Sequence, residues 1–208
     1  KHLGCADERE LCNRLHIDLP VPVSPRSAGP AVAADADVFG CRFRDVAYGT
    51  GSYRECIHHP LAGYSSVAEI ARNYRWPSPD WYDYSVIPRQ LAGLERFPVR
   101  GGGSEPFLTY KNLRGDEQAF VDLVENAELA QYILGKLFDL AYEHTRRIFE
   151  TIPGKVMISY VAEDMGGQED LMISPAQIRE FLLPGMRRMI GLVHGAGAYA
   201  FHHNDGAI

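Results

Sequence analysis

Two apolar runs, each followed directly by polar residues and glycine, stand out along the chain. Residues 156–162 are almost wholly apolar, and the sequence EDMGGQ follows at 163–168. Residues 198–201 form a second apolar run, which leads into HHNDG at 202–206. Short apolar runs bounded by turn residues are typical of buried strands. Strands that carry polar groups at their carboxyl ends predict a site at one edge of an α/β protein.

Helical patterns fill the sequence around these strands. Apolar residues at helical spacing predict helix across 115–152, which Pro153-Gly154 ends. Ser174-Pro175 has the N-cap and first-turn chemistry of a further helix, which is predicted to reach residue 194. A short strand is predicted at 97–99, before the glycine-rich turn 100–106. The order from residue 97 therefore predicts three parallel strands whose carboxyl ends, at 100–105, 163–168 and 202–206, share one rim.

The first 96 residues have a different pattern. A short helix is predicted at 7–15, and the proline-rich segment 19–37 is predicted to be an extended loop. A β-hairpin is predicted over 41–57, followed by a helix that begins after Ser66 and by another helix at 84–95. We therefore expect residues 1–96 to form a helical and β-hairpin elaboration that packs on residues 97–208.

Composition narrows the functional classes. The 208 residues are 46% apolar and 23% charged, which is typical of a globular domain. The net charge of −6 argues against a nucleic-acid partner, and no apolar run approaches the ~18 residues of a membrane span. The four cysteines form no CxxC pair, which favours reduced thiols and a cytoplasmic location. A sheet of only three strands would end in an exposed edge strand whose backbone N–H and C=O groups have no partner. The chain is therefore expected to be a fragment.

Several motifs, in the same order, resemble the uroporphyrinogen decarboxylase superfamily. The central signature of that family is similar to EDMGGQ at 163–168, LMISP at 171–175 and REF at 179–181, and its next strand-end motif is similar to HNDG at 203–206. Upstream, 37–40, 48–51, 59–61 and 74–81 resemble the decarboxylase-like branch. The resemblance implies a partial TIM barrel, (β/α)8, of which this chain supplies about the first three strands.

The same resemblance implies two chemistries. The family includes enzymes that decarboxylate porphyrinogens without a cofactor, and zinc-dependent methyltransferases that move methyl groups between corrinoid proteins and thiols. In the methyltransferase branch a His-x-Cys motif binds zinc, and here His203 matches the histidine while Asp205 replaces the cysteine. A carboxylate makes a harder metal site than a thiolate. A metal site at His203 and Asp205 is thus implied, and the alternative is that His203 hydrogen-bonds a substrate.

The remaining candidate residues lie on the same predicted rim. Glu163 and Asp164 have the chemistry of a general acid, a general base or a metal ligand, unless one of them only caps a turn. Arg100, Gly102, Gln168 and Asp205 are the candidates for substrate binding, since glycine backbone N–H groups can approach an anion closely. Glu163, Asp164 and His203 are the candidates for catalysis.

Three functions remain open from the sequence. The first is methyl transfer to or from a small molecule with a corrinoid protein as partner. The second is decarboxylation of a porphyrinogen or another polycarboxylate, and the third is non-catalytic binding of a tetrapyrrole or corrinoid. A polycarboxylate needs several arginines to hold it, and the arginine-bearing motif of the decarboxylase is not visible. Methyl transfer is therefore preferred, and the isolated chain is expected to be inactive because half of the rim is missing.

Overall fold

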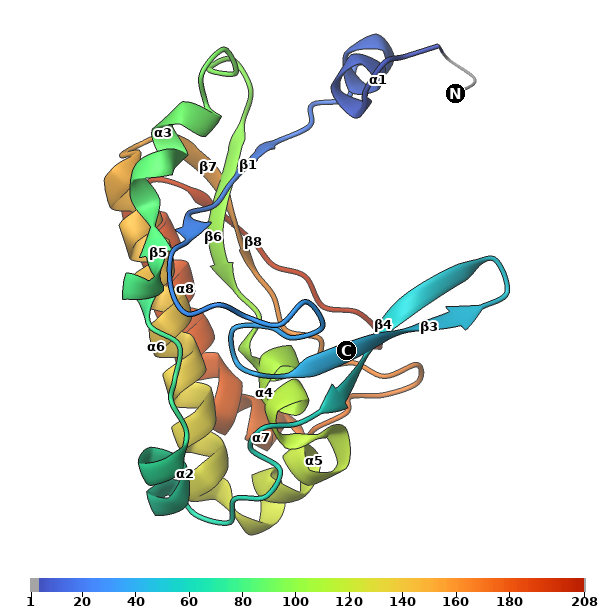
Figure 1. The fold of residues 1–208 in the computed structure, drawn as a ribbon, viewed down its shortest axis with the longest axis vertical. Helices are drawn as coiled ribbons and strands as arrows, with labels where there is room; N and C mark the ends of the chain where they lie inside the picture. Colours follow the sequence, from blue (N-terminus) through green and yellow to red (C-terminus); the bar gives the residue numbers. More distant parts are fainter. Residues whose placement is uncertain (1–3, 208) are drawn as a thin grey trace.

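A parallel four-stranded sheet forms the centre of the chain. The computed structural model describes residues 4–207. Its strands lie in the order β1 (Val21–Val23), β6 (Val99–Ser104), β7 (Val156–Val161) and β8 (Tyr199–Phe201), and all neighbours pair in parallel (Figure 1). The predicted α/β class and the predicted alternation of strands and helices after residue 97 are confirmed.

The sheet has one strand more than the sequence predicts. β1 lies inside segment 19–37, which the sequence predicts to be a loop because of its prolines. Pro22 is tolerated because β1 is an edge strand, where a missing N–H breaks no ladder bond. The Val21 N–H donates to the Pro98 carbonyl at 2.8 Å, and both valines of β1 are buried. The N-terminal segment thus supplies a strand to the sheet, and its division from 97–208 at residue 96 stays a prediction.

The glycine run lies inside β6 and not in a turn after it. Gly102 and Gly103 have φ angles of 70° and 126°, and the pairing with β7 shifts register between Arg100 and Gly103. A Cβ on Gly102 would lie 2.6 Å from the Cγ2 atom of Thr145, in the helix behind the strand. Glycine is therefore required both by the backbone conformation and by the close approach of strand and helix.

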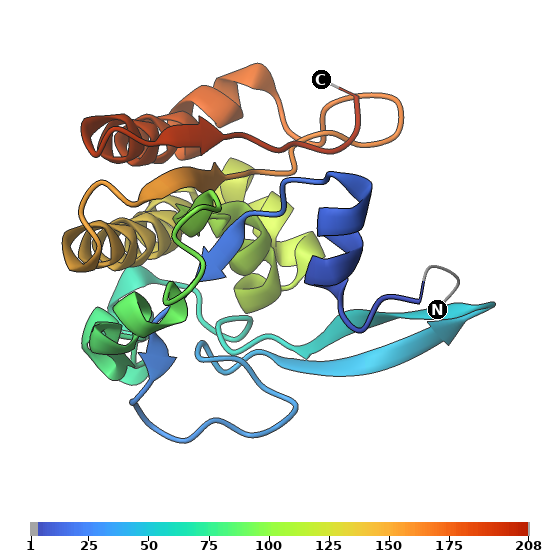
Figure 2. The ribbon, with the colours of Figure 1, turned by 90° about the horizontal axis from the view of Figure 1, so that it is seen from above.

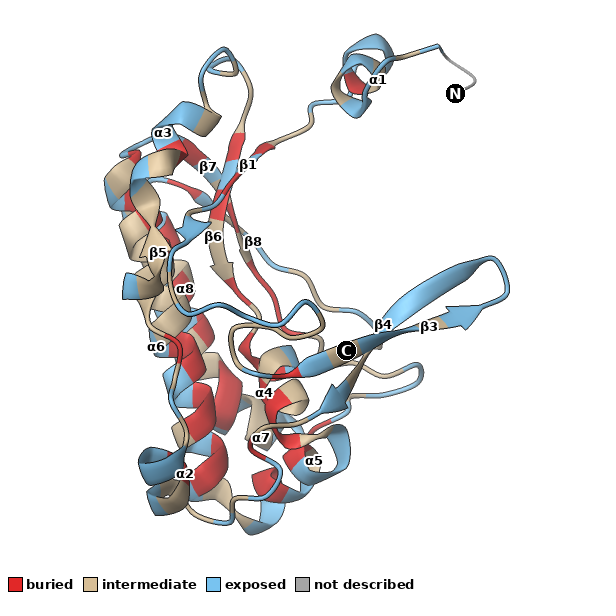
Figure 3. Cartoon of the chain, viewed as in Figure 1, coloured by how far each residue is buried: buried red, intermediate tan, exposed pale blue. Residues whose placement is uncertain are grey.

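Helices cover one face of this sheet. α4 (Pro106–Arg114), α5 (Asp116–Glu125) and α6 (Ala127–Thr151) connect β6 to β7, and α8 (Leu183–Gly195) leads into β8. α6 and α8 lie side by side along the strands in both views (Figures 1 and 2). The buried residues follow the inner sides of α4, α5 and α6 (Figure 3), and the largest fully buried side chains include Phe107, Tyr110, Leu129, Ile133, Ile148 and Met189. Within residues 4–207, no helix has both the length and the apolar composition needed to cross a membrane.

The helix predicted after Ser174 forms in three parts. α7 (Pro175–Gln177) continues into the π-helical turn η3 (Ile178–Leu182), and α8 follows. The π turn ends beside Pro184, which has no N–H to donate to the preceding turn. Ser174 forms a capping box, because its hydroxyl accepts from the Gln177 N–H at 3.2 Å and the Gln177 side chain accepts from the Ser174 N–H at 3.0 Å.

Loss of this cap gives a testable change in stability. Ser174→Ala is expected to lower the free energy of unfolding by about 1 kcal/mol, because the Gln177 N–H loses its acceptor and the Gln177 side chain loses the hydroxyl that donates to it. Urea unfolding followed by circular dichroism measures the change. The control is Glu169→Ala in the exposed loop before the helix, for which no loss is expected. An equal loss in both variants would contradict this role of the cap.

The hairpin and the first helices of the N-terminal segment agree with their predictions. β3 (Arg42–Tyr48) and β4 (Gly51–His58) form the antiparallel hairpin, and α1 (Glu8–Leu15) begins after Asp7. α2 (Val67–Asn73) has Ser66 as its N-cap. In both views the hairpin and α1 extend away from α6 and α8, and most of their residues are exposed (Figures 1, 2 and 3).

The helix predicted at 84–95 is shorter than expected. The structure has η1 (Pro79–Trp81), β5 (Tyr82–Asp83), η2 (Tyr84–Val86) and α3 (Ile87–Gln90) in this region. Residues 91–97 turn instead of continuing the helix, and Gly93 has a φ angle of 76° in that turn. β5 pairs with β2 (Arg26–Ser27), so this region packs back onto the proline-rich segment.

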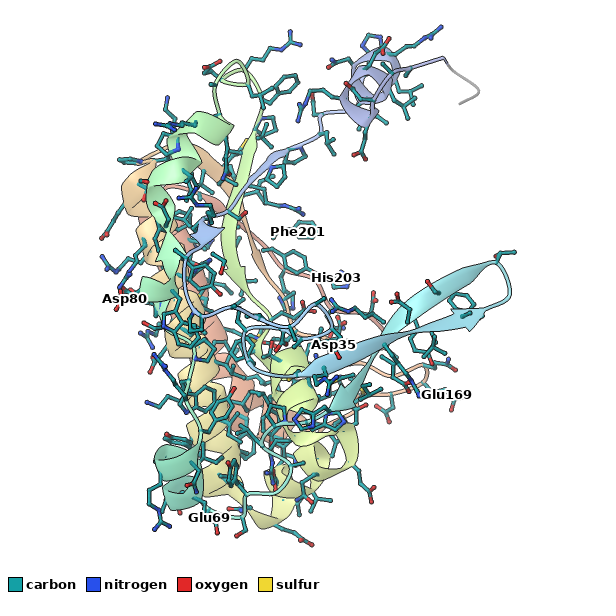
Figure 4. The ribbon with its side chains drawn as sticks, viewed as in Figure 1. Asp35, Glu69, Asp80, Glu169, Phe201 and His203 are labelled. Carbon is teal, nitrogen blue, oxygen red and sulfur yellow. The ribbon has the colours of Figure 1, made fainter. Side chains whose placement is uncertain are left out.

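The sheet face opposite the helices carries exposed aromatic side chains. Tyr199 and Phe201 of β8 are 68% and 55% exposed. The rings of Phe201 and Tyr160 stack with centroids 5.9 Å apart, and Tyr160 stacks in turn with His203. Figure 4 shows Phe201 and His203 pointing away from the helices. An aromatic strip therefore leads along the open face to the carboxyl ends of β7 and β8.

Candidate functional site

The loops that follow β7 and β8 lie against each other, as the sequence predicts. The hydrogen bonds that join them include Glu163 N–H to the His203 carbonyl (3.1 Å), Met165 N–H to Asn204 Oδ1 (2.7 Å), and Asp205 N–H to Asp164 Oδ1 (3.1 Å). The first bond continues the parallel pairing beyond the strands, and the other two use side chains of the motifs themselves. The polar residues of the two motifs are thereby fixed in one place.

Asp164, His203 and Asp205 form a compact cluster. His203 Nε2 lies 3.5 Å from Asp164 Oδ1 and 3.4 Å from Asp205 Oδ1. One potential ligand atom from each of the three residues lies within 4.8 Å of the others. The Tyr160 ring stacks against the imidazole with centroids 6.0 Å apart, which restrains the plane of His203. The two residues that the resemblance implies as metal ligands thus lie together, and Asp164 joins them.

This donor set fits a divalent metal ion. Zinc binds imidazole nitrogen and carboxylate oxygen, and catalytic zinc sites use three protein ligands with one position left for substrate. With two carboxylates and no thiolate, the cluster is harder than a His-x-Cys site and also suits other first-row divalent ions. A site for one ion needs at least three His, Cys, Asp or Glu side chains whose ligand atoms lie close together. Residues 4–207 contain one such group, and it is this cluster.

Glu163 points away from this cluster into the protein. Its side chain is fully buried, and Oε2 accepts from the Phe107 N–H at 2.9 Å, in the first turn of α4. Adjacent residues at a strand end face opposite sides, and Glu163 and Asp164 therefore separate. Oε1 has no hydrogen-bond partner in the described part of the chain. Burial raises the pKa of Glu163 to about 8, and the nearby Glu105 and Asp164 act in the same direction.

Glu105 is a site residue that the sequence did not single out. It follows β6 directly and stands at the N-cap of α4, so it brings the third strand end to the cluster. Burial raises the pKa of its carboxyl, the negative charge of Asp164 adds to this, and His203 opposes it. Like Glu163, it directly follows a strand. The sequence does not indicate this, because the glycine run predicts a turn where β6 in fact continues to Ser104. The predicted common rim of the three strand ends is confirmed.

Three of the predicted substrate-binding residues lie outside the cluster, each in a different place. Arg100 lies within β6 and is exposed. Burial raises the pKa of Tyr160, and the positive charge of the nearby Arg100 acts in the opposite direction. Gly102 packs against Thr145 on the helix side of the strand. Gln168 is exposed in the loop after β7. The substrate roles of these residues and the catalytic roles of Glu163, Asp164 and His203 stay predictions.

Fold and site together define an α/β protein with a parallel sheet and a cluster of acidic residues and histidine at its strand ends. A methyltransferase from Methanosarcina mazei has a similar structure, with a TM-score of 0.54 and 16% sequence identity. The match covers 94% of this chain and 54% of the methyltransferase, so the chain spans about half the length of that protein. No protein-family model matches the sequence. No curated protein matches it either. At this identity the likeness establishes the fold.

Proposed function

We propose that this chain is part of an enzyme that transfers a methyl group, and that Asp164, His203 and Asp205 bind its metal ion. The observation that carries the proposal is the meeting of these three side chains at the ends of β7 and β8. The structural likeness to a methyltransferase supports it, and so does the motif resemblance to the methyltransferase branch of the uroporphyrinogen decarboxylase superfamily. Zinc is the metal we propose, since it accepts this mixture of donors.

In this proposal the four strands belong to a (β/α)8 barrel. The helices α6 and α8 would form part of its outer layer, and the exposed face with Tyr199 and Phe201 would look into its interior. Barrel enzymes place their sites at the carboxyl ends of the strands, which is where the cluster lies. The match covers only 54% of the methyltransferase with the similar fold, which is consistent with further strands in a complete barrel.

The residues of the chain have distinct tasks in the proposed site. Asp164 and Asp205 supply negative charge that offsets the charge of the cation, and the Asp205 N–H holds the Asp164 carboxylate in place. Tyr160 restrains the His203 ring, so that its nitrogen stays directed at the two carboxylates. A bound zinc ion would activate a thiol acceptor by favouring its thiolate form. The methyl donor would be a corrinoid protein and the acceptor a small thiol.

The charge of the site counts against decarboxylation of a polycarboxylate. Glu105, Asp164 and Asp205 gather at the rim, and Arg100 is the nearby candidate for holding a carboxylate. A substrate with several carboxylates needs several guanidinium groups, because each bidentate pair offsets one negative charge. A thiol and a methyl donor do not need several guanidinium groups to bind them. Methyl transfer therefore fits the rim better than the decarboxylation alternative.

Metal binding tests the proposed ligands directly. His203→Ala is expected to weaken zinc binding by more than about 100-fold, because even the partners of metal ligands contribute about 10- to 100-fold. Competition with a chromophoric chelator measures the affinity. The matched control is His202→Ala, since His202 is the adjacent histidine and bonds the Val161 carbonyl through Nδ1 at 2.7 Å instead of joining the cluster. Equal zinc affinity in both variants would overturn the proposed ligand set.

Methyl transfer is tested on the full-length protein. The zinc-loaded enzyme is mixed with methylcobalamin and a simple alkyl thiol, and the loss of the methylcobalamin absorbance is followed with time. The wild type and His202→Ala are expected to form the thioether, and His203→Ala is expected to lose most of the rate. Zinc binding without any thioether would leave a metal site but refute methyl transfer to thiols.

A further inference from the structure

A cavity of about 220 Å³ lies beside α6, between that helix and the N-terminal segment. Leu137, Ala141 and His144 of α6 form one wall, and Phe39 and Tyr82 form the opposite wall. The end of β6 adds Ser104 and Glu105 to the lining. An apolar cavity of about 150 Å³ is enough to hold benzene, so this one has room for a single ring with a small substituent.

The walls of the cavity are held in place by hydrogen bonds. The Asp37 carboxylate accepts from the Phe39 N–H at 2.9 Å, and the Tyr74 hydroxyl donates to the Phe39 carbonyl at 2.7 Å. On the other side the Tyr84 hydroxyl and His144 Nδ1 lie 2.8 Å apart. The cavity is thus formed before any ligand arrives, and a ligand would lose little free energy in ordering it.

Ser104 supplies the polar group of the cavity. The residue is 8% exposed, and its buried Oγ atom has no hydrogen-bond partner among residues 4–207. A buried hydroxyl without a partner is uncommon and calls for a water or a ligand to bond it. His144 adds a second polar group, because Tyr84 occupies only Nδ1 and Nε2 is the remaining ring nitrogen. Burial lowers the pKa of His144, and Arg147 adds to this, so the ring is neutral at pH 7.

The charges around the cavity select against anions. None of its lining residues is a lysine or an arginine, and the imidazole of His144 is uncharged at pH 7. Glu105 is the acidic residue of the lining, and it faces the negative charge of Asp164 on its other side. An anionic ligand would gain no ion pair here and would lose its hydration, which costs several kcal/mol in an apolar site.

We propose that this cavity is a binding site for a small uncharged molecule that has one apolar ring and one hydroxyl group. The ring would fill the space between Phe39 and Ala141, and the hydroxyl would bond Ser104 and His144. The site shares Glu105 with the rim of strand ends, but it lies against α6, and its lining includes none of Asp164, His203 and Asp205. The proposal therefore holds or fails independently of the proposed methyl transfer.

Three probes of similar size separate the contributions of ring, hydroxyl and charge. Benzyl alcohol has both ring and hydroxyl, toluene lacks the hydroxyl, and benzoate carries a negative charge. Each is titrated into the isotopically labelled protein, and binding is followed by NMR through the signals of the α6 and β6 residues. We expect saturable binding of benzyl alcohol, about three- to tenfold weaker binding of toluene, and no saturation with benzoate.

Two variants locate the binding. Ser104→Ala removes a hydroxyl that has no partner, so the fold should tolerate it. This variant is expected to bind benzyl alcohol only as well as toluene. Ala141→Leu fills the cavity and is expected to weaken both probes at least about tenfold. The unfolding curve of each variant shows whether the fold is kept.

Three results would overturn the proposal. They are the absence of saturable binding of benzyl alcohol by the wild type, equal binding of benzoate and benzyl alcohol, and unchanged affinity in a folded Ala141→Leu variant. His203→Ala, which alters the metal cluster, should leave benzyl alcohol binding unchanged. A loss of binding in that variant would place the probe at the cluster instead of in this cavity.

Discussion

Arg114→Ala is expected to lower the free energy of unfolding by about 3–5 kcal/mol, because it leaves a buried carboxylate without its partner. Arg114 and Asp122 are 3% and 2% exposed, and Arg114 Nε lies 2.6 Å from Asp122 Oδ2. The same guanidinium donates to the carbonyl of Tyr64 at 2.9 Å and also to the carbonyl of Leu61. One side chain therefore joins α4, α5 and the loop before α2.

The size of this effect follows from burial and not from the presence of an ion pair. Arg146 also pairs with two carboxylates, Glu143 and Glu150, but on the exposed side of α6. Arg146→Ala is the matched control, and a loss of no more than about 1 kcal/mol is expected for it. Urea unfolding of both variants gives the comparison. Similar losses for Arg114 and Arg146 would show that the buried pair does not hold these elements together.

A second variant separates the charge from the hydrogen bonds. In Arg114→Met with Asp122→Leu both charges are removed, so no uncompensated carboxylate remains. The double variant is expected to be more stable than Arg114→Ala alone, although the carbonyls of Leu61 and Tyr64 still lose their donor. If the double variant were the less stable of the two, packing and not charge would account for the loss.

Glu163→Gln is expected to stabilise the protein by about 3 kcal/mol at pH 7, with the metal removed by a chelator. The carboxyl is fully buried, and burial raises its pKa from 4.5 to about 8. At pH 7 folding must therefore take up a proton on Glu163. Glutamine is neutral at every pH and keeps an oxygen that can accept from the Phe107 N–H. The variant thus removes the cost of the proton without removing the bond to α4.

The sign of the pH dependence follows from the raised pKa. Below about pH 4.5 the carboxyl is protonated in both the folded and the unfolded state, so wild type and variant should be equally stable. As the pH rises towards 8 the folded state holds a proton that the unfolded state has lost, and the wild type loses stability relative to the variant. Glu105 and Asp164 face the group and increase the effect, whereas the Phe107 N–H and Lys111 reduce it.

Unfolding midpoints measured at several pH values between 4 and 8 test this expectation. The control is Glu169→Gln, because Glu169 is exposed in the following loop. The difference between Glu163→Gln and the wild type should grow with pH, and the difference for Glu169→Gln should stay near zero. A constant difference for Glu163→Gln would mean that the carboxyl does not bind a proton more tightly in the folded protein.

The sequence predicted the regular elements wherever one chemical signal dominated. Helical spacing and the Pro153-Gly154 stop predicted the helices between β6 and β7, and Ser174-Pro175 predicted the start of the last helical region. The strand β1 was missed because two favourable valines flank a proline, and only the edge position makes that proline acceptable. The sequence predicts a turn at the glycine run, because it does not show that α6 lies close behind the strand.

The sequence by itself determined that polar residues follow β7 and β8, and parallel pairing was enough to predict that residues 163–168 and 202–206 meet at one rim. Only the tertiary structure decided which acid serves which purpose. Glu163 faces the start of α4 and Asp164 faces His203, because adjacent residues at a strand end point to opposite sides. Glu105 and the cavity beside α6 also came only from the structure, since both depend on contacts between segments far apart in the chain.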